Sequence, residues 1–146
     1  MAYCGGQDIL NLALPIPALQ SNLLDRQVTA VCQAASDEAD GHFRGRWGYS
    51  AVPLLTWDSS ITLNVARRSA YLLMLIRGMK PGGEDFKILS VVNAEALAFF
   101  NAVQRQQIHP LVTLANNTAP GGVQPSVITS SVVNLANGGS RRNRGW

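Results

Sequence analysis

The sequence predicts an all-α fold: a small bundle of three long helices and a short N-terminal helix, followed by an extended C-terminal arm. Three long stretches repeat apolar residues at steps of three and four, which is the spacing of one helix face. Paired glycines favour turns, and they fall where this periodicity changes, at Gly5-Gly6, Gly82-Gly83, Gly121-Gly122 and Gly138-Gly139. Beyond Pro110 the helical spacing ends. We therefore expect a helical domain over residues 1–110 and an arm over residues 111–146.

The length and the cysteine content fit one domain that folds without cross-links. A chain of 146 residues buries about 68–70% of its unfolded surface. Cys4 and Cys32 lie far apart in the sequence and outside any C-x-x-C pair, so they indicate neither a metal site nor a disulfide framework. No basic region followed by an apolar run opens the chain, so we expect cytosolic folding and a mature protein that starts near Met1.

The first two helices are predicted before residue 48. Residues 7–14 favour a short helix that Pro15 ends, because proline clashes with the preceding turn. A longer helix is predicted from Asp25, a residue type suited to the N-cap, to about Arg46. Its apolar stripe consists of Val28, Val31, Cys32, Ala35, Ala39 and Phe43.

Three acidic residues on this second helix predict a solvated surface. Asp37 faces away from the apolar stripe, and Glu38 and Asp40 flank it on opposite sides. Because the three point in different directions and His42 is the only nitrogen ligand nearby, they do not favour a metal or acid–base site. The i,i+4 spacing predicts that Glu38 pairs with His42, and Asp40 with Arg44.

The central helix is predicted from its N-cap Asp58 to Gly78, after a loop bounded by Trp47 and Trp57. Every residue from Ala70 to Ile76 is apolar, so this helix must be covered on several sides. The apolar run is far shorter than the ~20 residues that a bilayer needs, so we expect a core helix and no membrane.

The third long helix begins at Glu84 and Asp85, whose charge suits a helix N-terminus, and it ends near Arg105. Its stripe is Phe86, Leu89, Val92, Ala96, Phe99, Phe100 and Val103.

The arm ends in a basic tip on a neutral body. The net charge is +3, and without the three arginines of the tip the chain holds nine basic and nine acidic residues. An extended segment of this composition favours adding to a partner's sheet edge. We expect these arm residues to bind a partner protein or DNA: Val127, Ile128, Val132, Val133, Arg141, Arg142, Arg144 and Trp146. A tail kept for solubility is the alternative.

Catalytic motifs are missing from the sequence. It contains no G-x-G-x-x-G, no G-x-x-x-x-G-K-[ST], no H-E-x-x-H and no G-x-S-x-G. His42 and His109 are too few and too separated for a histidine-rich metal site. We expect no enzyme, no catalytic residue, no cofactor and no metal. A helix-turn-helix is also disfavoured, since the helical part is neutral.

Several segments resemble one family of phage proteins. The most specific is A-x-x-E-A-D-G-x-F-x-x-R-W at residues 35–47, and the others are Tyr3-Cys4 with Asp8-Ile9, Pro53-Leu54, and Asn93–Phe100 with Val103. Over residues 1 to about 112 the chain resembles the small helical head-to-tail adaptor (connector, head-completion) proteins of long-tailed bacteriophages and gene transfer agents. The signature residues are Ala39, Asp40, Gly41, Phe43, Arg46, Trp47 and Pro53. Departures are Trp47 in place of a common tyrosine, Arg67-Arg68 in place of an acidic partner, and Gln106-Gln107 in place of a glycine.

This resemblance implies a structural virion protein at the head-to-tail junction, made in the host cytoplasm. It implies a dodecameric ring of neighbouring copies, docked on the portal protein and followed by a stopper or tail-terminator protein. Double-stranded DNA would pass through the ring without sequence recognition. The alternative is a DNA-binding or packaging accessory protein that uses the basic C-terminal tail.

Overall fold

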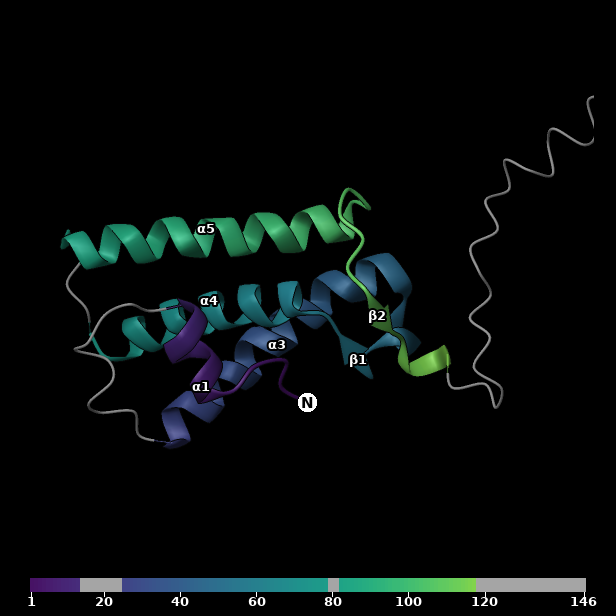
Figure 1. Cartoon of the computed structure of the whole chain (residues 1–146), viewed down its shortest axis with the longest axis horizontal. Coiled ribbons are helices and arrows are strands. Elements are labelled where there is room, and N and C mark those ends of the chain that lie inside the picture. The colour runs from purple at the N-terminus through teal and green to yellow at the C-terminus, as the bar shows by residue number, and fades with distance from the viewer. Residues whose placement is uncertain (14–24, 79–81, 118–146) are drawn as a thin grey trace, which may run out of the picture. The chain divides into compact units, whose positions relative to one another are not determined.

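The computed structural model describes residues 1–13, 25–78 and 82–117, and these residues are mostly helical (Figure 1). A short first helix, α1 (Gly6–Asp8), continues into the π-helix η1 (Ile9–Ala13). The long helices are α3 (Asp25–Trp47), α4 (Ser59–Ile76) and α5 (Glu84–Gln104). The predicted bundle of three long helices and a short N-terminal helix is therefore confirmed.

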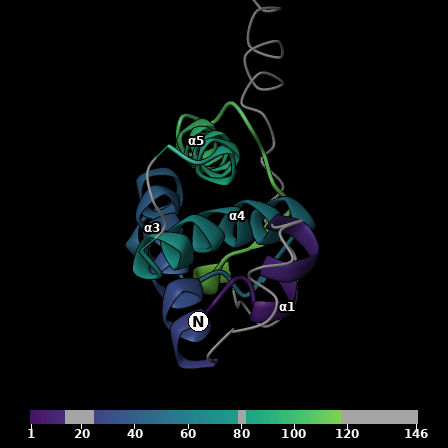
Figure 2. The same ribbon diagram turned by 90° about the vertical axis from the view of Figure 1, so that its left-hand side faces the viewer.

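Helix α4 lies at the centre of the described body. It contacts α3, α5 and η1, and Figures 1 and 2 both show it between α5 and the N-terminal helix. Its fully buried apolar residues are Ile61, Val65, Ala66, Ala70 and Leu73. The prediction that this helix needs cover on several sides is confirmed. Leu75 and Ile76, in its last turn, are exceptions, because they are 48% and 57% exposed.

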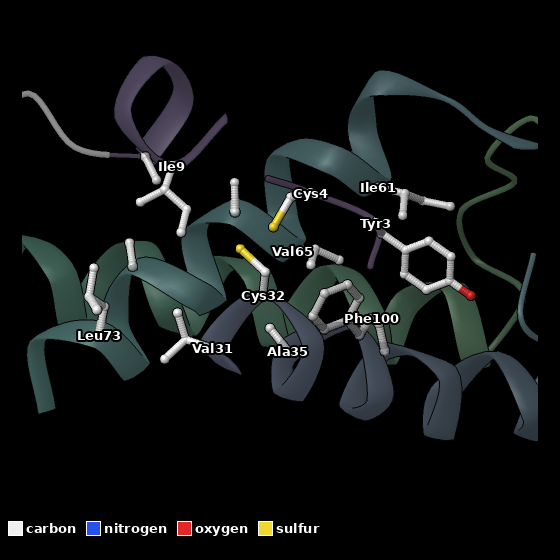
Figure 3. Packing of buried hydrophobic residues seen from close by; sticks show 14 of the residues in the cluster. Tyr3, Cys4, Ile9, Val31, Cys32, Ala35, Ile61, Val65, Leu73 and Phe100 are labelled. Carbon is white, nitrogen blue, oxygen red and sulfur yellow. The ribbon is translucent and has the colours of Figure 1, made fainter. Parts of the chain in front are cut away.

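The core joins the N-terminal segment to all three long helices (Figure 3). Tyr3 and Ile9 come from the N-terminal segment, and both are buried. They meet Val31 and Ala35 of α3, Ile61, Val65 and Leu73 of α4, and Phe100 of α5. Phe100 and the other buried residues of α5, Leu89, Ala96 and Val103, all belong to the stripe that the sequence predicts.

A small antiparallel sheet ties the chain after α5 to the loop before α4. The short helix η2 (Tyr49–Ala51) precedes strand β1 (Thr56–Trp57), which pairs with β2 (Val112–Thr113); Thr56 lies opposite Thr113. Leu114 packs against the core, and the 3-10 helix η3 (Ala115–Asn117) follows. Residues 111–116 therefore lie on the body rather than in the arm, because the first compact unit extends to Asn116.

Polar side chains link the three long helices. Arg68 of α4 donates from Nε to Glu38 Oε2 of α3 at 2.7 Å and from Nη1 to Asn93 Oδ1 of α5 at 2.8 Å. The predicted pair of Glu38 with His42 is wrong, because the guanidinium of Arg68 reaches Glu38 with two donors. His42 Nδ1 instead shares a 2.8 Å hydrogen bond with Gln104 Oε1.

One carboxylate, Asp58, both starts α4 and holds the chain after α5. Asp58 Oδ1 accepts from the backbone N–H groups of Ser60 (3.1 Å) and Ile61 (3.3 Å), as expected for an N-cap. Asp58 Oδ2 accepts from the Leu111 N–H at 2.8 Å. Partial burial opposes the charged form, but hydrogen bonds from the Ser60 hydroxyl and from the three N–H groups lower the pKa of Asp58 overall.

We predict that Asp58→Ala lowers the free energy of unfolding at neutral pH by about 1–2 kcal/mol, since a helix cap and a tertiary hydrogen bond are lost. The folded pKa of Asp58 lies below the unfolded value of about 3.9, so its stabilisation is present above that pH and is lost as pH falls through the folded pKa. Urea unfolding across pH should show the two proteins converging in acid. The exposed Asp37→Ala is the control, with a change within about 0.5 kcal/mol. A difference that stays constant with pH would contradict this role.

Candidate interaction surface

The signature residues of α3 meet the N-terminal segment at the hydroxyl of Tyr3. That hydroxyl donates to Asp40 Oδ1 and accepts from the Leu54 N–H at 2.9 Å. The Tyr3 ring is buried, with ring centroids 6.0 Å from Phe43 and 4.8 Å from Trp57. One buried side chain therefore joins α3, the loop before α4 and the N-terminal segment.

Asp40 is buried, so its predicted role as a solvated flank paired with Arg44 is wrong. The N-terminal segment covers this side of α3 and brings the Tyr3 hydroxyl to the carboxylate. Burial raises the pKa of Asp40, and the hydrogen bond from Tyr3 and the charge of Arg44 oppose that rise. Burial, and then the hydrogen bond to Asp40, raise the pKa of Tyr3.

Arg46 fixes the C-terminal end of α5 to α3. Arg46 Nη1 donates to the carbonyl oxygens of Val103 (3.1 Å) and Ile108, and Nη2 donates to His109 Nδ1 at 2.7 Å. Its guanidinium also lies over the Trp47 ring, 4.6 Å from the centroid. The last carbonyls of a helix have no partner within the helix, so a cation placed there stabilises the helix end.

The remaining signature residues divide between core and surface. Ala39 is fully buried. Pro53 is exposed and follows a cis peptide bond. Gly41 is exposed, and a Cβ atom there would meet no atom within 4 Å. At Gly45, in contrast, a Cβ atom would lie 2.7 Å from the side chain of Gln104, so glycine leaves room for that side chain.

Within the described residues, the outward side of α5 carries exposed apolar side chains, with the exposed Lys87 and Glu95 among them. We call Ile88, Val91, Ala94 and Ala98 the α5 outer face; all four are exposed, and their steps of three and four place them on one side of the helix. Ile88 and Val91 are 54% and 59% exposed. The predicted α5 stripe omits these residues, and the signal that could have identified them is that they are apolar although they lie off the buried stripe.

The helix α5 is also long and apolar enough to be compared with a membrane span. Among the described residues, α5 is the one helix long and apolar enough to cross a membrane by length and composition, and 22% of its most apolar window is buried. In the body, however, α5 packs against α3 and α4, and Glu95 forms an ion pair with Arg67 at 3.2 Å. A spanning arrangement would require these contacts to break.

A hollow on α3 lies beside the exposed Tyr49. Its volume is about 310 Å³, and Gly41, Arg44, Gly45 and Tyr49 line it. The guanidinium of Arg44 lies 6.0 Å from the centroid of the Tyr49 ring. The absence of a side chain at Gly41 and Gly45 keeps the hollow open, and an aromatic ring at its edge is typical of protein contacts.

The described ranges 1–13, 25–78 and 82–117 contain no group of three or more His, Cys, Asp or Glu side chains placed to hold a metal ion.

The predicted partner-binding residues of the arm lie outside the described residues: Val127, Ile128, Val132, Val133, Arg141, Arg142, Arg144 and Trp146. Comparisons with protein-family models, curated proteins and solved structures found no match. The candidate surfaces are therefore the α5 outer face and the hollow beside Tyr49.

We predict opposite effects of two changes at Asp40. Asp40→Asn keeps an oxygen that accepts from the Tyr3 hydroxyl but removes a buried charge, so the free energy of unfolding at neutral pH should stay equal or rise by up to about 1 kcal/mol. Asp40→Ala should lower it by about 1–3 kcal/mol, because the buried hydroxyl loses its acceptor. Urea unfolding of both variants measures the contrast. An Asn variant as unstable as the Ala variant would mean that the charge itself stabilises the fold.

Proposed function

We propose that this protein is a structural adaptor of a bacteriophage virion. Copies form a ring below the portal protein, join the DNA-filled head to the tail or neck, and leave a channel for DNA. The proposal rests on the resemblance of residues 1 to about 112 to head-to-tail adaptor proteins and on the uncovered apolar side of α5. The protein needs no catalytic residue and no cofactor for this role.

The α5 outer face is the observation that carries the proposal. A solvent-exposed helix normally presents polar residues on its outer side, whereas α5 presents Ile88 and Val91 to solvent. Ala94 and Ala98 continue the face with small side chains, which let another chain approach the helix backbone. An apolar patch with polar surroundings is typical of a protein contact surface.

A ring requires two different surfaces on each copy, because its contacts are heterologous and repeat head to tail. The α5 outer face supplies an apolar, convex surface. The hollow beside Tyr49 supplies a recessed surface with an aromatic ring and the cationic Arg44. We propose that these two surfaces face neighbouring copies.

Two other roles compete with the adaptor. A membrane contact would use the same α5 outer face, but the contacts of α5 with α3 and α4 favour a helix that stays in the body. A DNA-packaging accessory protein would use Arg141, Arg142 and Arg144. The described body gives that role little support. Its resemblance is to adaptor proteins, and its candidate contact surface, the α5 outer face, is apolar rather than basic.

We predict that Val91→Glu folds normally but weakens attachment to heads that carry the portal of the same phage by at least tenfold, which is about 1.4 kcal/mol. A carboxylate on the α5 outer face would be desolvated in a subunit contact. Mass photometry of portal and adaptor mixtures, with circular dichroism as a folding check, measures both effects.

The control is Leu12→Glu, which changes an exposed leucine of η1, and it should attach like the wild type. Val91→Glu that attaches normally would contradict the assigned contact. Flotation with lipid vesicles gives a separate outcome: wild-type protein that floats, and Val91→Glu that does not, would assign the face to a membrane.

We also predict that the free adaptor binds double-stranded DNA weakly and that replacing Arg141, Arg142 and Arg144 by alanine barely changes the salt dependence. If the tail neutralised three phosphates, the slope of log K against log salt would change by about 2.7. Fluorescence anisotropy with a duplex at several salt concentrations measures this slope. Tight binding with that change would favour the packaging accessory protein instead.

A further inference from the structure

The structure brings together two cysteines that the sequence gives no reason to pair. Cys4 follows Tyr3 in the N-terminal segment, and Cys32 lies in the first half of α3. Both thiols are free and buried, with 7% and 2% exposure. Figure 3 shows their sulfur atoms pointing toward one another in the core. Proximity of this kind in a packed core permits an intramolecular bond and excludes most intermolecular ones.

We propose that Cys4 and Cys32 form a reversible intramolecular disulfide when the protein meets a peroxide. The bond would fasten the N-terminal segment to α3. This inference does not depend on the proposed function, because it concerns the chemistry of two side chains in the body.

The surroundings of the two sulfurs favour this chemistry. The neighbouring Cys32 thiol, and then burial, raise the pKa of Cys4, and the neighbouring Cys4 thiol lowers the pKa of Cys32 against the effect of burial. Ser69 Oγ lies 3.5 Å from Cys4 Sγ and gives the site a further polar neighbour. Cys32 is therefore the thiol that loses its proton first and reacts first.

The reaction balances with hydrogen peroxide as the two-electron oxidant. The Cys32 thiolate attacks one peroxide oxygen, the O–O bond breaks, and the products are a Cys32 sulfenic acid and, after proton uptake, one water. Cys4 sulfur then attacks the Cys32 sulfur, the S–O bond breaks, and the hydroxyl group leaves with the Cys4 proton as a second water. The proton taken up in the first step replaces the one that Cys32 released. In total, two thiols lose two electrons and two protons, and one peroxide becomes two waters.

The backbone around the pair is held in place by other contacts. The Tyr3 N–H donates to Ser36 Oγ at 2.9 Å, and Ser36 Oγ donates to the Cys32 carbonyl at 2.7 Å. Ser36 thus ties Tyr3, the residue before Cys4, to Cys32. Forming the S–S bond would bring these two facing sulfur atoms to about 2.05 Å.

The disulfide should stabilise the fold. It closes a loop of about 30 residues, and this reduces the conformational entropy of the unfolded chain enough to raise Tm by about 10 °C. Dithiothreitol should reverse the rise, because a buried disulfide becomes accessible to thiol exchange when the N-terminal segment opens.

The test uses the full chain under native conditions. After hydrogen peroxide treatment, the protein is denatured, alkylated and digested with trypsin without reduction. Cleavage after Arg26 and Arg44 separates the Cys4 peptide from the Cys32 peptide. We expect a linked peptide pair, an intact monomer mass about 2 Da lower than that of the reduced protein, and a higher Tm.

Cys4→Ser and Cys32→Ser are the matched controls, and neither should gain the linked pair or the rise in Tm. Three results would overturn the proposal: two alkylated thiols after native oxidation, linkage only between separate chains, or an intramolecular link that forms only in denatured protein. Because the wild-type chain carries the main readout, the result does not depend on how well the serine variants fold.

Discussion

The burial of α4 is the constraint on which the rest of the body depends. Its second half is apolar on all sides, so no single neighbour can cover it, and α3, α5 and the N-terminal segment each contact it. Asp58 connects this helix to the chain beyond α5 by capping the start of α4 and accepting from the Leu111 N–H. The helix α5 covers one side of α4, and within the described residues its opposite side leaves Ile88 and Val91 exposed.

The long-range contacts explain which features the sequence could predict. Periodicity predicts α3, α4 and α5 because a core-facing stripe repeats within each helix. It could not predict that Tyr3 reaches Asp40 or that Cys4 meets Cys32, because both pairs depend on where the N-terminal segment lies. Glu38 shows the same limit: i,i+4 spacing favoured a partner on its own helix, and Arg68 of a different helix binds it.

The signature residues mostly stabilise the fold, and the candidate contact surfaces use other residues. Asp40 accepts from Tyr3, and Arg46 holds the end of α5. Any protein with this packing would need both residues. Their presence therefore indicates the fold and does not by itself indicate the function. The sequence prediction omits the α5 outer face. In a sequence, an exposed apolar residue of α5 differs from a buried one only in its position relative to the predicted apolar stripe. Apolar side chains at such exposed positions do not stabilise the isolated body, but a contact with another chain can bury them.

A cryo-electron microscopy reconstruction of portal-bearing heads with this protein bound tests the central claim most directly. The adaptor proposal predicts a closed ring below the portal in which Ile88 and Val91 of each copy are buried against a neighbouring copy. A ring in which the α5 outer face points to solvent, or a complex without a ring, would contradict it.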